Sequence, residues 1–390
     1  MTAICCSFAY TDYPGAYAPG TNRRVSMKKT LVVLLALVVL ASGTLFAQGT
    51  QEAGKPYIAV VSKGEQHDFW QQVKLGANAA AATYNVDITF EGPPSESDVQ
   101  IQVEMLNNAM AKKPVAIALA ALNTSSVLDQ LQQTKNQGIP VIGFDSGVPE
   151  APAGSIWANA STNNYAAAGQ AAEKMFAVIK SRIEAATDAR PVKIVVMNQD
   201  ASGESLLSRG KGFRDTMVKL IDEQTKLSKA DIAVTGNTAF IAADSPKTGK
   251  KVIIDMIVPA SAAMTDATNA AQAVLNRVAS DNVLGIFCSN EATVKGLLAA
   301  TNDGATLKSN AALRNVVVIG YDAGAAQKNA VRNQYFLGSI TQDPYQIGYK
   351  AVELAYKAYK GEPVADVDTG AKFYNYQNMD NADIKGLLYD

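Results

Sequence analysis

The chain has 390 residues, of which 48% are hydrophobic, enough for two domains of ordinary size that each bury a core. Its 35 basic and 36 acidic residues leave a formal net charge of -1. Because these charges are scattered and form no basic block, the composition gives no reason to expect nucleic acid or an anionic membrane as a partner.

The strongest local signal lies near the N-terminus. A basic start at residues 27–29 precedes an apolar run over residues 31–40 and small residues before Ala47. This three-part pattern predicts a secretory signal peptide over residues 27–47, cleaved near Ala47, and therefore a periplasmic location. The alternative is a membrane anchor, because residues 31–47 reach the lower limit for a span.

Residues 1–26 match none of the usual targeting segments, so we expect an over-called start with Met27 as the true one. They contain Cys5 and Cys6, which leaves Cys288 as the one cysteine after cleavage. We therefore expect no intramolecular disulfide in the exported protein.

From Pro56 onward, apolar runs typical of strands alternate with amphipathic helical stretches. In the first series, we expect Asp98 to cap one helix and Ser125 to begin another. The predicted strands cover residues 57–61, 88–90, 115–119 and 140–144.

A second series begins near Trp157. Thr162 or Asn163 is expected to cap a long helix with Tyr165 on its buried face. Residues 228–250 interrupt the rhythm and are interpreted as an insertion, with a hairpin turning at Ser245-Pro246. Further strands are predicted over residues 192–197, 252–258, 283–287, 316–319 and 337–340.

Alternation of this kind predicts an α/β fold with parallel sheets and right-handed crossovers. Roughly ten strands are too many for one small open sheet and fall into two groups, so we expect two doubly wound, Rossmann-like lobes.

Ligands bind beyond the carboxyl ends of the strands in such sheets, so the side chains there are the candidates for a binding site. They comprise aromatic rings, carboxylates, amides and one arginine, which together suit a polyhydroxylated ring. The stronger candidates are His67, Phe69, Trp70, Asp145, Arg209, Asn290, Asp322 and Gln342, and the weaker ones are Ser62, Gln66, Ser146 and Tyr321.

Each candidate also has an ordinary structural interpretation. Asp145 and Asp322 could cap the helices that follow them, and Phe69 and Trp70 could belong to the core of the first helix. His67 could be solvated. The candidates gain weight together, because all of them fall at the same kind of position.

Six segments carry a resemblance to a known family. They are GIPVIGFDSGV at 138–148, STNNYAAAG at 161–169, SRGKGF at 208–213, GIFCSNE at 285–291, VVVIGYDAG at 316–324 and ITQDPYQIGYKAVE at 340–353. In order and spacing the chain resembles the ribose/galactose-type periplasmic binding proteins of ABC importers, the type I family that shares its fold with LacI-type ligand domains. The resemblance covers nearly all of residues 56–390.

The resemblance implies roles for the candidate residues. Phe69 and Trp70 would flank a sugar ring, with His67 or Gln66 at the position of a loop amide. Asp145 and Asp322 would bind hydroxyls, together with Arg209, Asn290 and a hinge-proximal Gln342. Ser146 stands where a second arginine is expected, Met264 where an aromatic is expected and Ala120 where an asparagine is expected, which puts ribose itself in doubt.

The resemblance also implies a cleft that closes on its ligand and then presents a composite surface to a membrane permease, with no cofactor and no metal. The N-terminal lobe would comprise residues 55–157 plus 343–366, and the C-terminal lobe residues 158–342 plus 367–390. Three crossing strands near residues 157–159, 342–344 and 367–368 would join them. We expect a soluble monomer.

Other functions remain open at this point. An enzyme is disfavoured, because the sequence has no phosphate-binding glycine loop, no GxSxG and no metal-spaced Cys/His cluster. A glycosidase could still use Asp145 and Asp322 as its carboxylate pair. A LacI-type regulator would need a helix-turn-helix where the signal peptide stands. A sensor-only protein would share the site, and nucleosides, autoinducer-2 and inositol remain possible ligands.

Overall fold

The computed structural model describes Gly20 and residues 54–65 and 67–389. Lys55–Asp390 form one compact unit, and all contacts described below lie within it. The expected over-called start, apart from Gly20, lies outside the described residues, as do the predicted signal peptide and Gln66. Within the described part, no helix is both long and apolar enough to span a membrane.

The first lobe is built on a six-stranded parallel sheet with the order β12-β5-β4-β3-β1-β2. Alternate residues of β1 face opposite layers: Ile58 and Val60 pack with α2 and α11, whereas Ala59 and Val61 pack with α3 and α4. The strands are β1 (Tyr57–Val61), β2 (Asp87–Glu91), β3 (Ala116–Leu119), β4 (Val141–Phe144), β5 (Ile156–Ser161) and β12 (Val367–Asp368). The helices are α2 (Asp68–Tyr84), α3 (Val99–Ala111), α4 (Leu128–Gln137) and α11 (Pro344–Tyr359).

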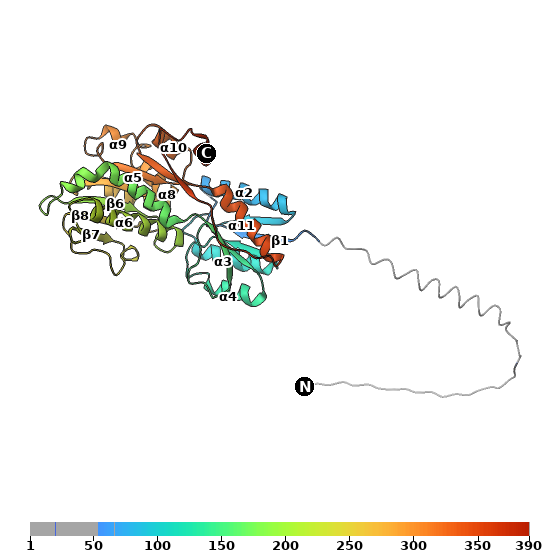
Figure 1. Cartoon of the computed structure of the whole chain (residues 1–390). Coiled ribbons are helices and arrows are strands. Elements are labelled where there is room, and N and C mark those ends of the chain that lie inside the picture. Colours follow the sequence, from blue (N-terminus) through green and yellow to red (C-terminus); the bar gives the residue numbers. More distant parts are fainter. Residues whose placement is uncertain (1–19, 21–53, 66, 390) are drawn as a thin grey trace, which may run out of the picture. The chain divides into compact units, whose positions relative to one another are not determined.

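The second lobe is built on a seven-stranded sheet with the order β13-β11-β10-β9-β6-β8-β7, parallel except for the β11–β13 pair. Helices α5 and α6 cover one face, and α7, α8 and α10 cover the other (Figure 1). The strands are β6 (Val192–Met197), β7 (Ile232–Gly236), β8 (Val252–Ile257), β9 (Val283–Cys288), β10 (Val317–Tyr321), β11 (Gly338–Gln342) and β13 (Ala371–Tyr374). The helices are α5 (Asn164–Glu184), α6 (Glu204–Gln224), α7 (Met264–Leu275), α8 (Glu291–Ala299), α9 (Thr306–Ser309), α10 (Ala325–Arg332) and α12 (Ala382–Lys385).

The chain passes between the two sheets three times. It leaves the first sheet after Ser161, returns at Asp343 between β11 and α11, and leaves again at residues 369–370 between β12 and β13. The strand β5 stays paired with β4 and β12 beyond Trp157. The predicted α/β fold of two doubly wound parallel-sheet lobes is confirmed.

Several local predictions were wrong. The residues after α6 form no hairpin: β7 is a parallel strand beside β8, and Pro246–Gly249 runs along its outer edge through backbone hydrogen bonds. Tyr165 does not face the core, because its side chain is 47% exposed and its hydroxyl donates to Asp215. The helix expected from Ser125 begins at Leu128.

Two predicted helix caps had different outcomes. The Asn163 side chain caps α5 by accepting from the Ala166 N–H at 3.1 Å. Asp98 does occupy the N-cap position of α3, but its side chain makes no capping hydrogen bond.

Glycines allow the outer helices of both lobes to pack at close range. A Cβ at Gly76 of α2 would overlap the Tyr345 carbonyl of α11, and one at Gly348 of α11 would overlap the Val73 carbonyl of α2. The same arrangement joins α5 and α6, where Gly212 lies against the Tyr165 carbonyl. In both lobes the helix backbones touch where a side chain would hold them apart.

Replacing Gly348 by alanine should therefore destabilise the protein by about 2–3 kcal/mol, the usual cost of forcing extra volume into a packed contact. Urea unfolding followed by circular dichroism measures this loss. Gly386→Ala is the matched control, because no atom lies within 4 Å of its added Cβ. If the two variants had the same free energy of unfolding, the close contact between α2 and α11 would contribute nothing to stability.

Candidate functional site

A small cavity lies between the carboxyl ends of the two sheets. Its volume is about 20 Å³, room for roughly one water molecule. The first lobe lines it with Lys63, His67, Phe69, Trp70, Glu96 and Asp145, and the second with Leu206, Arg209, Asn290, Glu291 and Asp322. The side chains around it therefore contact mainly one another.

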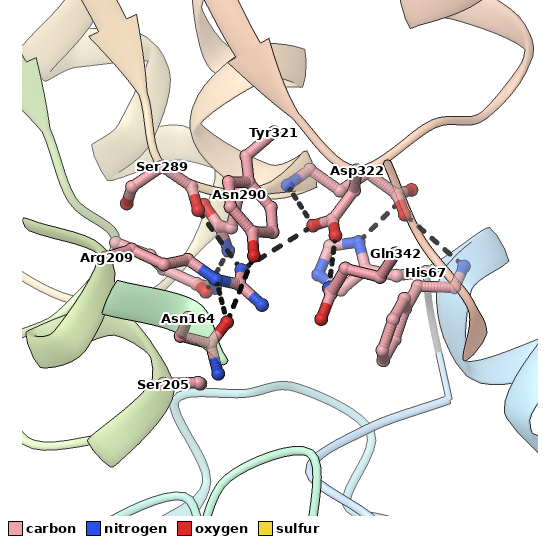
Figure 2. Close-up of polar contacts among 12 residues, drawn as sticks. His67, Asn164, Ser205, Arg209, Ser289, Asn290, Tyr321, Asp322 and Gln342 are labelled. Carbon is pink, nitrogen blue, oxygen red and sulfur yellow. Dashed lines mark hydrogen bonds and ion pairs between the residues drawn. The ribbon is translucent and has the colours of Figure 1, made fainter. Parts of the chain in front are cut away.

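The structure brings most of the predicted site residues together at this cavity. Seven of the eight stronger candidates line it, and the eighth, Gln342, donates a hydrogen bond of 2.6 Å to Asp322 (Figure 2). Of the weaker candidates, Ser62 instead bonds the Gly64 carbonyl, and the Ser146 hydroxyl accepts from the Ser205 N–H across the lobes. Tyr321 lies beneath the Arg209 guanidinium.

Two positions noted as departures from the ribose pattern also lie away from the cavity lining. Met264 begins α7 with a side chain that is 39% exposed. Ala120 is buried after β3, where its carbonyl accepts from the Gln102 side chain.

The two strand-end aspartates have matching backbones in the two lobes. Asp145 follows β4 with φ 54°, and Asp322 follows β10 with φ 76°, both in the left-handed region that disfavours side chains. Neither is a helix N-cap: β4 leads directly to β5, and Gly324 occupies the N-cap of α10. Strained residues held in this way concentrate at functional sites.

Asp322 is the centre of the polar network of the second lobe. It accepts from the Glu291 N–H at 3.0 Å, and its Oδ2 lies 3.8 Å from an Arg209 nitrogen. Burial raises the pKa of the Asp322 carboxyl, an effect that Arg209 and the hydrogen bond from Gln342 only partly offset. Both members of the Arg209–Asp322 pair are buried.

Arg209 is fixed on all sides. Its Nε donates to Asn164 at 2.7 Å, a second nitrogen donates to the Ser289 carbonyl at 3.1 Å, and its guanidinium lies 3.8 Å from the centre of the Tyr321 ring (Figure 2). Such contacts leave the guanidinium little freedom to reorient, so it presents a fixed cation to the cavity.

Asp145 is the least satisfied charge of the site. Among the described residues, its carboxylate has the Lys63 ammonium at 3.8 Å and no hydrogen-bond donor. Burial raises the pKa of Asp145 to about 6, although Lys63 and Arg209 oppose the rise. A buried carboxylate in this state is ready to accept hydrogen bonds.

The aromatic wall belongs partly to the core and partly to the cavity. Phe69 and Trp70 meet edge to face with ring centres 5.0 Å apart, and Trp70 also packs against Phe144. The Trp70 indole N–H donates to Glu96 at 2.7 Å. Both rings line the cavity although each is at most 5% exposed, so the two interpretations of these residues are compatible.

Sequence reasoning missed Lys63, Glu96, Leu206 and Glu291. Lys63 and Glu291 come two and three residues after the ends of β1 and β9, so the rule that selected the other candidates could have found them, whereas Leu206 is an apolar residue within α6. Glu96 lies in the loop after β2, whose proline and serine residues gave no sign of a site. Lys63 and Glu291 stand beside chosen residues, at positions more typical of solvated charges.

In the described part of the chain, no group of three or more His, Cys, Asp or Glu side chains is placed to hold a metal ion. The first lobe supplies an aromatic wall and both lobes supply buried hydrogen-bonding groups, an arrangement typical of a binding site for a small polar molecule.

The fold and this cleft define a type I, two-lobed binding protein. The chain belongs to the periplasmic binding protein family, because a family model described as a periplasmic binding protein domain matches residues 58–363. The family to which the sequence motifs pointed is thereby confirmed.

Three relatives are informative. A solved structure from Brachyspira murdochii, described as an ABC transporter, LacI family transcriptional regulator, is 40% identical with a TM-score of 0.71, over 86% of this chain and 99% of that one. An ABC transporter solute-binding protein from Agrobacterium vitis with bound D-fucose is 28% identical with a TM-score of 0.67, over 85% and 100%. The D-allose-binding periplasmic protein of Escherichia coli K12 is 24% identical over 81% of this chain and 88% of its own length.

The pKa of Asp145 leads to a testable pH dependence. Because its folded-state pKa lies above the ordinary value of 3.8, the folded protein holds the proton more tightly between about pH 4 and 6. The stability contributed by protonated Asp145 is therefore lost as pH rises through this window, by about 2–3 kcal/mol. Asp145→Asn cannot titrate, so its stability relative to wild type should increase between pH 4.5 and 7.5 in urea unfolding. A constant difference would show that Asp145 titrates normally.

Proposed function

We propose that this chain is the substrate-binding component of an ABC importer and that it encloses a small polyhydroxylated ligand, a monosaccharide, by closure of its cleft. The observation that carries the proposal is the convergence of an aromatic pair and two strained aspartates from opposite lobes on one cavity. Aromatic rings stack on the C–H faces of a sugar, and carboxylates accept from its hydroxyls.

The size of the cavity supports a closing cleft. About 20 Å³ cannot contain a monosaccharide, so a ligand has to enter when the lobes stand further apart. Residues of both lobes would contact it only after closure, so binding would stabilise the closed form. The three chain crossings would then act as the hinge about which the lobes move.

We assign ligand contacts to His67, Phe69, Trp70, Asp145, Arg209, Asn290, Asp322 and Gln342, and add Lys63 and Glu96. The bound sugars named for the relatives support this class of ligand: D-fucose occupies the Agrobacterium vitis protein, and the Escherichia coli relative is named for D-allose.

In the cell, we propose export with cleavage near Ala47 and delivery of the ligand to a membrane permease by a monomer without enzymatic activity. The lobes would divide after Ser161, at Asp343 and at residues 369–370, so the first and third boundaries lie a few residues beyond those expected from the sequence. A sensor that passes its signal to a receptor would use the same cleft, and a permease encoded beside this gene would favour import.

A thermal-shift screen of the protein against monosaccharides, polyols and nucleosides tests the ligand class, because a ligand that binds the folded state raises the melting temperature. We expect a monosaccharide to give the largest shift. Asp322→Ala should weaken its binding by about 2–4 kcal/mol, the cost of deleting a charged hydrogen-bond partner. Stabilisation by nucleosides alone, or unchanged affinity in the variant, would contradict the proposal.

The chain has 2 tryptophans, which allows a direct optical test. Trp157 is 48% exposed, whereas Trp70 lines the cavity. In a Trp157→Phe background, the sugar should change the emission of Trp70 as the ring is covered. Trp70→Phe should abolish the response and weaken binding, while Trp157→Phe alone keeps full affinity. If the emission change were lost in Trp157→Phe and kept in Trp70→Phe, the ligand would bind outside this cavity.

A further inference from the structure

The start of helix α2 in the first lobe lies against the start of α8 in the second. Glu291 is the first residue of α8 and is 3% exposed. Its carboxylate oxygens lie 3.4 Å from the N–H groups of Asp68 and Phe69, the first two residues of α2. A carboxylate of one lobe thus meets the positive end of a helix in the other.

Helix α2 has no cap of its own. His67 occupies its N-cap position, and the His67 side chain makes no capping hydrogen bond. The first N–H groups of a helix have no partner inside the helix, so they need an acceptor from elsewhere. Glu291 supplies that acceptor from the opposite lobe.

Three further contacts strengthen the connection. The His67 imidazole Nδ1 lies 3.6 Å from Glu291, where Glu291 and Glu96 raise the pKa of His67 against the effect of its burial. Lys295, one turn along α8, contacts Glu291 and lies 3.6 Å from the Asp68 carboxylate. Each lobe therefore contributes one basic and one acidic side chain to this contact between α2 and α8.

The connection also reaches the candidate ligand site. The N–H of Glu291 donates to Asp322 at 3.0 Å, and Phe69 begins the aromatic wall. Glu291 is therefore bonded through its backbone to one wall of the cavity and through its side chain to the other.

We propose that Glu291 and Lys295 form a latch on the N-terminus of α2, which stabilises the closed cleft without a ligand and positions the aromatic wall against Asp322. The inference rests on the proposed function only in that the two lobes can separate. If the lobes separated, the first N–H groups of α2 and the Glu291 carboxylate would lose their contact and be exposed to water. The same contacts would hold the lobes together around a bound ligand, which slows its release and raises the apparent affinity.

Hydrogen exchange of the ligand-free protein tests the latch directly. The Asp68 and Phe69 amides have no acceptor within their own helix, so their protection reports the contact with Glu291. Glu291→Gln should increase their exchange several-fold, and Lys295→Met should do so to a smaller extent. The amides of β3, far from the latch in the sheet, should keep their protection, which separates loss of the latch from loss of the fold.

Glu353→Gln is the matched control. Glu353 is also largely buried and also bonds two lysines, Lys350 and Lys357, but all three lie within α11 of the first lobe. This variant should leave exchange at Asp68 and Phe69 unchanged. Exchange of these amides at the rate of an unprotected chain in the wild type, or equal exchange in wild type and Glu291→Gln, would overturn the latch.

The affinity for a sugar found in the thermal-shift screen gives the second readout. Glu291→Gln should raise its Kd roughly tenfold through faster dissociation, because one of the contacts that hold the lobes around the sugar is weakened, whereas Glu353→Gln should not. An unchanged Kd in Glu291→Gln would overturn the positioning role. If no sugar binds, the proposed function fails, and the exchange experiment still decides the latch.

Discussion

Buried charge at the junction of the lobes is the constraint on which the rest of this structure depends. Lys63 and Arg209 are buried with Asp145, Glu291 and Asp322 around a space of about 20 Å³, and the partly buried Glu96 lies beside them. Taking ions out of water carries a large penalty unless opposite charges and hydrogen bonds replace the solvent. Because the compensating partners lie in both lobes, as with Glu291 and the α2 amides, these contacts link the two lobes across the cavity.

The two sheets and their helices fix the positions of these charges. Parallel strands end at a common edge of each sheet, so the residues that follow them meet without long loops. Asp145 and Asp322 turn away from their strands with positive φ, a conformation that the surrounding packing has to enforce. Backbone contact at Gly76 and Gly348 fixes α2 against α11, and α2 carries the aromatic wall. Rigid elements rather than flexible loops therefore position the groups that would touch a ligand.

The sequence contained enough information for the fold and for most of the cavity, but it did not reveal which charges pair. Asp145 and Asp322 were found because apolar runs mark where strands end, and strand ends define the edge of a sheet. Glu96 escaped notice because a carboxylate in a loop of prolines and serines looks solvated until the indole of Trp70 is seen to donate to it. The pairing of β7 beside β8 was missed because strand order depends on long-range contacts that a local pattern does not encode.

The ion pairs around the cavity also limit which ligands the cleft can accept. Three carboxylates around the cavity, those of Asp145, Glu291 and Asp322, already have a cationic partner, so a charged ligand would compete with an existing ion pair. A neutral ring with several hydroxyls can instead insert between the pairs, because each hydroxyl both donates and accepts. Asp145 needs donors, and the Gln342 Oε1 atom has no hydrogen-bond partner in the described part of the chain. These two positions, one in each lobe, are where a hydroxyl would add hydrogen bonds without breaking an existing pair.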